Sequence, residues 1–136
     1  MLADARSTPA RIAAVLYADG DLLFCDYAPP AELMQRFRAR KDGQIAGLEL
    51  LAVALGLCTW PDRLRKRNVV IFSDSTIAEF GLKKGCAKEL DHCAVIHAFW
   101  VSILELDASV WVDRVPTGVT CPRRGPRHAT RAAPRA

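Results

Sequence analysis

Three acidic residues stand at positions where a carboxylate could do chemistry: Asp4, Glu49 and Asp74. Glu49 lies on the apolar face of an expected helix, and no basic residue three or four positions away accounts for it by a local ion pair. Asp74 follows a short apolar run, at the kind of strand end where ligand sites gather in α/β sheets. Two alternatives stay open, namely that Glu49 reaches solvent at the helix edge and that Asp74 or a flanking serine caps the next helix.

The chemistry of these carboxylates depends on whether they converge. Three carboxylates in one cleft repel one another, and divalent cations relieve that repulsion. Hard oxygen donors of this kind suit Mg²⁺ or Mn²⁺. Two such ions, roughly 4 Å apart, can activate water and stabilise the leaving oxygen of a phosphodiester. Asp4, Glu49 and Asp74 together therefore indicate a candidate two-metal hydrolytic site, although Asp4 alone indicates nothing.

The elements that must position these residues follow from the pattern of apolar residues. The dipeptide Asp19-Gly20 between two apolar runs is a strong hairpin signal. Three- and four-residue spacing of apolar side chains predicts the helices, and a short continuous apolar run predicts a buried parallel strand. In chain order the pattern predicts a hairpin over 11–27, a helix over 43–58, a strand over 68–72, a helix ending at Lys84, a helix over 91–106 and a strand over 109–115. That order is typical of a mixed α/β sheet with an antiparallel start and parallel additions.

Composition limits the class of protein. The chain is 51% apolar and 25% charged, which is typical of a globular domain and excludes disorder throughout. Its longest nearly apolar run, over 45–58, is too short to cross a bilayer and contains Glu49, so no membrane association is expected. The net charge of +4 comes from residues 122–136, which hold five Arg and no acid. We expect one domain over 1–118 and a basic, disordered tail over 119–136. Five scattered cysteines indicate reduced thiols in an intracellular compartment.

Four stretches, in this order, resemble the ribonuclease H-like domain of retroelement reverse transcriptases: LADARSTPARIAAVLYADG, QIAGLELLAVALGL, VVIFSDSTIAEFGLKKG and HAFWVSILELDASVWVDRVPT. They cover about residues 2–117. The resemblance implies a five-stranded mixed sheet of order 3-2-1-4-5 flanked by helices, and Mg²⁺-dependent hydrolysis of the RNA strand of RNA–DNA hybrids. It makes Asp4, Glu49 and Asp74 both catalytic residues and ligands of two Mg²⁺ or Mn²⁺ ions. Lys83 and Lys84 are expected to add weak nucleic-acid contacts.

Two departures from the family pattern leave other interpretations open. The strand before Asp4 consists only of residues 1–3, so the first strand is expected to be truncated and further polyprotein domains to lie upstream. Thr120 and Arg123 stand where the family carries an Asn and a fourth acid. The domain is therefore expected to be either a ribonuclease, intact or degenerate, or a non-catalytic nucleic-acid-binding remnant of a retroelement polyprotein. A different two-metal nuclease or transposase on the same fold is the third interpretation.

Overall fold

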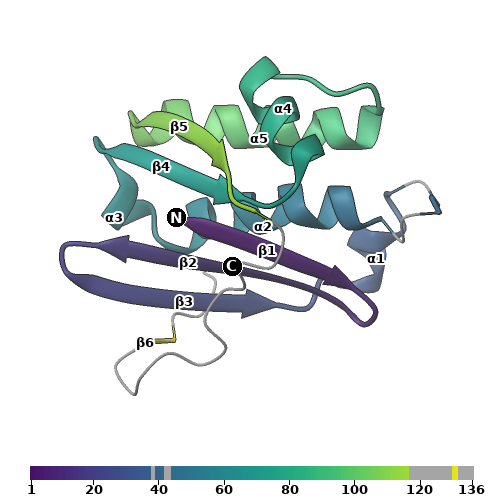
Figure 1. Cartoon of the computed structure of the whole chain (residues 1–136), viewed down its shortest axis with the longest axis horizontal. Helices are drawn as coiled ribbons and strands as arrows, with labels where there is room; N and C mark the ends of the chain where they lie inside the picture. The colour runs from purple at the N-terminus through teal and green to yellow at the C-terminus, as the bar shows by residue number, and fades with distance from the viewer. Residues whose placement is uncertain (38, 42–43, 117–129, 132–136) are drawn as a thin grey trace.

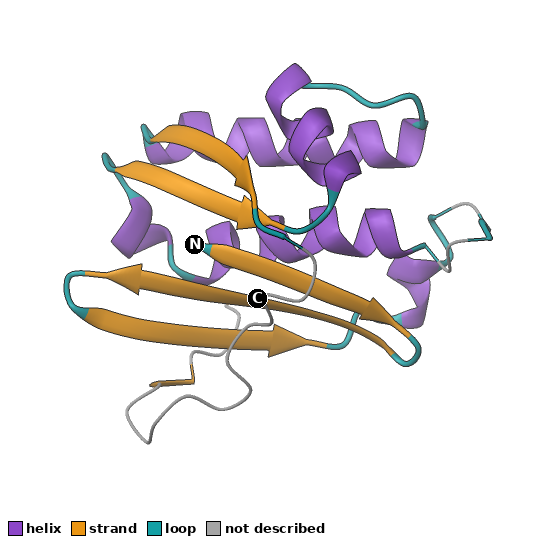
Figure 2. Cartoon of the chain, in the orientation of Figure 1, coloured by secondary structure: helices purple, strands orange, loops and turns teal. Residues whose placement is uncertain are grey.

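The protein forms one sheet with its longest helices packed against it (Figures 1 and 2). The computed structural model describes residues 1–37, 39–41, 44–116 and 130–131. The strands are β1 (Leu2–Ser7), β2 (Ala10–Ala18), β3 (Asp21–Tyr27), β4 (Asn68–Ser73), β5 (Ser109–Arg114) and β6 (Thr130–Arg131). The helices are α1 (Ala31–Met34), α2 (Ile45–Thr59), α3 (Pro61–Leu64), α4 (Thr76–Lys84) and α5 (Leu90–Leu106).

The strand order of the described sheet is β5-β4-β1-β2-β3-β6, and its first five strands confirm the expected order 3-2-1-4-5. β2 pairs antiparallel with both β1 and β3, whereas β4 runs parallel to both β1 and β5. The predicted hairpin turn is present, with positive φ at Asp19 (54°) and Gly20 (83°), as a type I′ turn requires. Strand β6 was not expected, because it lies within the segment predicted as a disordered tail. The rest of that segment lies outside the described residues.

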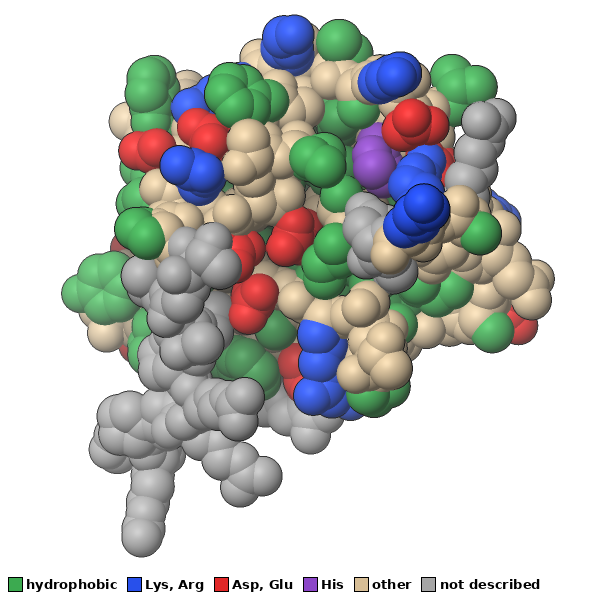
Figure 3. Space-filling view, turned by 45° about the vertical axis from the view of Figure 1, so that its right-hand side comes forward, with side chains coloured by type: hydrophobic (Ala, Val, Ile, Leu, Met, Phe, Trp, Pro, Cys, Tyr) green, Lys and Arg blue, Asp and Glu red, His purple; other side chains and the backbone are tan. Residues whose placement is uncertain are grey.

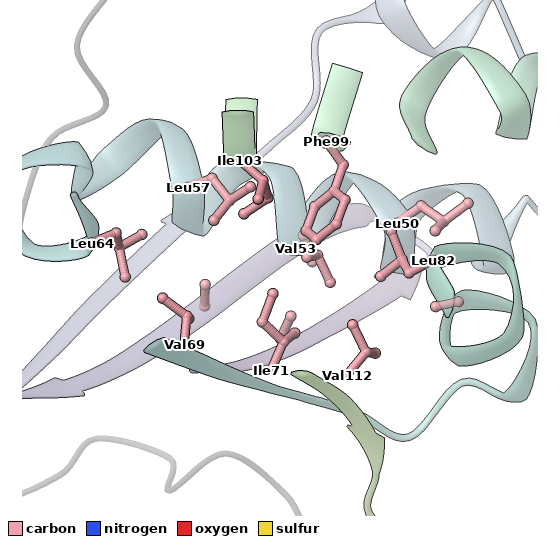
Figure 4. Packing of buried hydrophobic residues seen from close by; sticks show 14 of the residues in the cluster. Leu50, Val53, Leu57, Leu64, Val69, Ile71, Leu82, Phe99, Ile103 and Val112 are labelled. Atoms are coloured by element: carbon pink, nitrogen blue, oxygen red, sulfur yellow. The ribbon is translucent and has the colours of Figure 1, made fainter. Parts of the chain in front are cut away.

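The hydrophobic core lies between the sheet and helices α2, α4 and α5. α2 packs across β1 and β2 and against α5. Figure 4 shows side chains of α2 and α5 meeting those of β4 and β5. The labelled residues of this cluster that are at most 6% exposed include Leu50, Val53, Leu57, Val69, Ile71, Phe99, Ile103 and Val112. Each such side chain contributes about 1.5–3 kcal/mol by leaving water, so the helix that carries Glu49 is held firmly over the strand that carries Asp4.

α2 passes close to β1 and β2 at Gly56. A Cβ atom at Gly56 would lie 2.2 Å from Sδ of Met1 and 3.3 Å from Cβ of Ala14. A side chain at this position would therefore require the Met1 side chain to move and Ala14 to shift slightly.

Several boundaries differ from the sequence expectations. α2 begins at Ile45 because Gln44, the residue before it, has a left-handed backbone with φ 66°. Strand β1 continues beyond Asp4 to Ser7, because antiparallel pairing with β2 extends to Ser7↔Ala10. The short helix α3 was not predicted; it starts at Pro61, a residue suited to the first turn of a helix. None of the helices in the described part of the chain has the length and apolar content needed to span a membrane.

Candidate active site

Asp4 and Asp74 are brought together by the parallel pairing of β1 and β4. Leu2 lies opposite Phe72 in this parallel pair. Two residues later along both chains, position 4 is therefore level with position 74. Asp4 is the third residue of β1, and Asp74 follows Ser73, the last residue of β4. Both carboxylates therefore lie at the edge of the sheet that faces the carboxyl end of β4.

Glu49 reaches the same edge from the helix layer. It lies near the start of α2 and is half-buried. Burial raises the pKa of the Glu49 carboxyl, and the negative charges of Asp74 and Asp4 raise it further. A hydrogen bond from the Ser75 hydroxyl opposes this increase in pKa, and the Asp74 carboxyl lies within hydrogen-bonding reach of Glu49. Asp4 and Asp74 thus lie near Glu49, which favours convergence of the three carboxylates over an orientation in which Glu49 only reaches solvent.

Asp74 does not cap the helix that follows it. The side chain of Ser75 is the cap of α4, since its Oγ accepts a hydrogen bond from the backbone N–H of Ala78 at 3.1 Å. The Ser75 N–H donates to Oγ of Ser73 at 3.2 Å. Oδ1 of Asp74 is buried and has no hydrogen-bond partner among the described residues. A buried carboxylate oxygen without a partner is costly, so this atom is suited to a cation or an external donor.

Asp4 is held in place by its own backbone. Its Oδ1 accepts a hydrogen bond from the N–H of Ala5 at 2.8 Å, and the side chain is partly buried. Figure 3 shows acidic side chains gathered on the face that comes forward in this view. A local concentration of negative charge of this kind attracts cations and repels a phosphate backbone unless a cation lies between them.

The donor set fits a hard divalent cation. All three side chains offer carboxylate oxygens, the ligands that Mg²⁺ and Mn²⁺ prefer. In the described residues, no group of three His, Cys, Asp or Glu side chains is arranged to hold a metal ion by itself. Mg²⁺ commonly takes only one or two protein carboxylates and completes its shell with water and substrate phosphate. The buried Oδ1 of Asp74, which no described residue contacts by a hydrogen bond, is the observation that supports the fit.

The other predicted site residues lie in the last turn of α4 or outside the described residues. Nζ of Lys83 forms an ion pair with Oε1 of Glu79 at 2.7 Å. Lys84 is exposed and borders a shallow depression at the surface of α4, together with Phe80 and Lys88. The positions expected to carry the missing fourth acid, Thr120 and Arg123, lie outside the described residues.

Sequence reasoning missed the contact between Ser75 and Glu49. The Ser75 hydroxyl accepts a hydrogen bond from the N–H of Ala78, as expected of a helix cap, and it also donates one to Glu49. The available signal was the run Ser73-Asp74-Ser75, which places two hydroxyl groups beside the acid at the strand end. One serine therefore links the element that carries Asp74 to the helix that carries Glu49.

Comparisons with known proteins support the architecture. No family model and no curated protein sequence matches the chain. Its structure is similar to that of RNase H1 from the halophilic archaeon Halobacterium salinarum, with a TM-score of 0.61 and 16% sequence identity. The match covers 85% of this chain and 83% of that chain. At this level of identity the similarity shows the fold alone: a mixed sheet of order 3-2-1-4-5 with flanking helices, as in ribonuclease H.

Proposed function

We propose that this ribonuclease H-like domain hydrolyses the RNA strand of RNA–DNA hybrids with the help of divalent metal ions. The observation that carries the proposal is the convergence of Asp4, Glu49 and Asp74 from a strand, a helix and a strand end. The structural similarity to a protein named RNase H1 supports the choice of substrate. Similarity of fold alone would not fix the function, so the carboxylates carry the argument.

Each residue of the cluster has a distinct role in this proposal. Asp4, Glu49 and Asp74 would hold two Mg²⁺ or Mn²⁺ ions, with Oδ1 of Asp74, which lacks a partner in the described part of the chain, as one of the ligand atoms. Bound ions would supply an activated water and stabilise the charge on the leaving oxygen. The Ser75 hydroxyl would keep the Glu49 carboxylate directed toward Asp74. Lys84 would contact the phosphate backbone near the site, with a weaker contribution from Lys83 because Glu79 pairs with it.

The direct test is cleavage of an end-labelled RNA–DNA hybrid with Mg²⁺ and, separately, with Mn²⁺. We expect metal-dependent cutting of the RNA strand, and a loss of about 10²–10³-fold in D74N, the size typical of removing one group that stabilises transition-state charge. The matched control is D62N, because Asp62 is exposed on α3, next to the amino end of β4. Absence of cutting by a folded wild-type chain in both metals would contradict the proposal, as would equal rates in D74N and D62N.

A second candidate is a non-catalytic, nucleic-acid-binding remnant of a retroelement polyprotein. The sequence favours it at Thr120 and Arg123, where the family that the chain resembles carries an Asn and a fourth acid. A nearby arginine would also weaken a metal site by repelling the cation. Binding of the hybrid by a folded chain that cuts in neither metal would support this candidate over the enzyme.

We also propose that the domain derives from a retroelement reverse transcriptase and works beside upstream polyprotein domains in a reducing compartment. The four family-like stretches support the origin. The four cysteines in the described residues, Cys25, Cys58, Cys86 and Cys93, carry free thiols, which is compatible with that compartment. A polymerase domain encoded in frame directly upstream would support the origin, and an unrelated upstream sequence would contradict it.

A further inference from the structure

Arg114 brings a positive charge to the strand ends beside Asp74. It is the last residue of β5 and lies opposite Ser73 in the parallel pairing of β4 and β5, and Asp74 follows Ser73 directly. The N–H of Val115 donates to the carbonyl of Ser73 at 3.0 Å, so this register holds to the end of the sheet. Neighbouring strands lie about 4.8 Å apart and successive residues about 3.3 Å, which places the main chains of Arg114 and Asp74 about 6 Å apart. Figure 1 shows the ends of β4 and β5 side by side.

Two residues of α4 hold the Arg114 side chain on the helix side of the sheet. Its Nη1 donates to Oγ1 of Thr76 at 3.2 Å, and its Nε lies 3.9 Å from Oε2 of Glu79. The other carboxylate oxygen of Glu79 pairs with Nζ of Lys83 at 2.7 Å. The Glu79 side chain is 13% exposed, whereas that of Arg114 is 54% exposed. Most of the five N–H donors of the guanidinium group therefore have no partner among the described residues.

Stabilisation of the fold does not account for this arginine. The amino end of a helix carries positive partial charge, so a cation beside the amino end of α4 is unfavourable. The pair between Arg114 and Glu79 is long and exposed, and ion pairs of this kind contribute little to stability. Arg114 does not neutralise the carboxylate cluster either, because the charges that shift the pKa of Glu49 are those of Asp74 and Asp4, both negative. The guanidinium group is therefore free to bind an external anion.

We propose that Arg114 binds a backbone phosphate of the nucleic acid, next to the phosphate that the carboxylate cluster would hold through its metal ions. This inference rests on the proposed function, because it takes the cluster as the place where the substrate is cut. Phosphates of one strand follow one another at about 3.4 Å along the axis of a duplex, so a neighbour of the phosphate at Asp74 comes within reach of Arg114. The carboxylates repel the phosphates that flank the metal ions, and the guanidinium group offsets that repulsion. Its planar donors match two phosphate oxygens at once, which the ammonium group of a lysine does not.

The test compares R114A with R65A in binding of an RNA–DNA hybrid. Arg65 is a matched control, because it is exposed, its Nη1 donates to the carbonyl of Glu105 at 3.2 Å, and it lies before the amino end of β4. Fluorescence anisotropy of an end-labelled hybrid in Ca²⁺ measures binding at several salt concentrations, and a gel verifies that the RNA strand stays intact. We expect R114A to weaken binding about tenfold or more and to reduce the slope of log K against log salt by about 0.9, as for the loss of one phosphate contact. R65A should leave both quantities unchanged.

A second variant, R114K, separates phosphate binding from a structural role. Lysine keeps the charge but loses the planar donors, so R114K should keep the salt slope and bind more weakly than the wild type. If Arg114 only tied β5 to α4, R114A would lower the midpoint of urea unfolding and keep the wild-type salt slope, which would overturn the inference.

The outcome for Arg114 is distinguishable from the outcome for the proposed function. Cutting of the hybrid by the wild type, with equal binding by R114A and R65A, would overturn the inference and leave the proposed function standing. Binding that depends on Arg114, in a chain that cuts in neither Mg²⁺ nor Mn²⁺, would support the inference and contradict the proposed function. Absence of hybrid binding by the folded wild-type chain would overturn the inference as well.

Discussion

Replacing Glu49 by Gln should make the metal-free protein more stable at neutral pH. The pKa of Glu49 is raised because the side chain is partly buried and because Asp74 and Asp4 place negative charge beside it. Gln has the same shape and its carbonyl can still accept the hydrogen bond from Ser75, but it carries no charge. Like charges about 4–6 Å apart repel by about 3–4 kcal/mol at an effective dielectric constant of 20. Solvent screening of a partly exposed cluster reduces this to about 1 kcal/mol, the gain that we expect for E49Q at pH 7.

The gain should depend on pH with a definite sign. A carboxyl whose pKa is raised on folding binds more protons in the folded state, so wild-type stability falls as pH rises from the ordinary Glu value of 4.5 through the folded-state pKa. The advantage of E49Q should therefore be absent at pH 4 and fully developed above the folded-state pKa. Urea unfolding between pH 4 and pH 8 measures it, with E105Q as the control because Glu105 is exposed on α5. A gain of equal size at pH 4 and pH 8 would refute the electrostatic reasoning.

The same variant tests the role of the cluster in metal binding. A ligand at ten times its Kd stabilises the folded state by about 1.4 kcal/mol. We expect Mg²⁺ to stabilise the wild type and E105Q by this mechanism, and to stabilise E49Q less. Metal-free E49Q should thus be the more stable protein, whereas the difference should shrink or reverse as Mg²⁺ is added. Identical Mg²⁺ responses in E49Q and E105Q would refute the assignment of Glu49 as a ligand.

Three further changes test the core, the cap and the nucleic-acid surface. F99A should lower the free energy of unfolding by about 3–5 kcal/mol, whereas F80A should change it by less than about 1 kcal/mol, because Phe99 is 1% and Phe80 57% exposed. S75A should lower the free energy of unfolding by about 1 kcal/mol through loss of the α4 cap. It should also move the pH dependence assigned to Glu49 to higher pH, because the Ser75 hydrogen bond lowers the pKa of Glu49. S75N can still cap the helix and should therefore lose less stability than S75A. K84A should weaken hybrid binding and reduce the slope of log K against log salt by about 0.9, the effect of one phosphate contact. K66A should leave that slope unchanged, because Lys66 lies before the amino end of β4, whereas the carboxylates lie at its carboxyl end. Unfolding curves and salt titrations check these outcomes, and equal effects in any of the three matched pairs would contradict the placement of the residues.

Much of the fold could be predicted because its signals are local. The turn at Asp19-Gly20 needs residues that tolerate positive φ, and the sequence places them between two apolar runs. The stop of α4 at Gly85 follows the same logic, since that residue has φ 75°. The strand order could not be derived from such signals. It came from the family resemblance, and the structure confirms it for the first five strands.

The parts that could not be predicted depend on contacts between distant residues. The guanidinium group of Arg40 donates to both carboxylate oxygens of Asp91, at 2.9 and 2.7 Å, across 51 positions of sequence. Neither residue belongs to a local pattern, so nothing in the sequence joins them. The bond between Ser75 and Glu49 is of the same kind, because it depends on how α2 packs over the end of β4. The oddity of Glu49 on an apolar face was visible in the sequence, but the group that it contacts was not.

The energetics of the cluster bear on the choice between an enzyme and a remnant. Burial and the negative charges of Asp74 and Asp4 raise the pKa of Glu49. The charged form of Glu49 therefore destabilises the folded protein at neutral pH. Oδ1 of Asp74 adds the cost of a buried acceptor without a partner. A domain without metal-dependent chemistry would gain stability from a single change of Glu49 to Gln, which requires no repacking. These costs support our proposal that a cation binds at the cluster, and the stability of E49Q with and without Mg²⁺ tests that proposal against an explanation by packing alone.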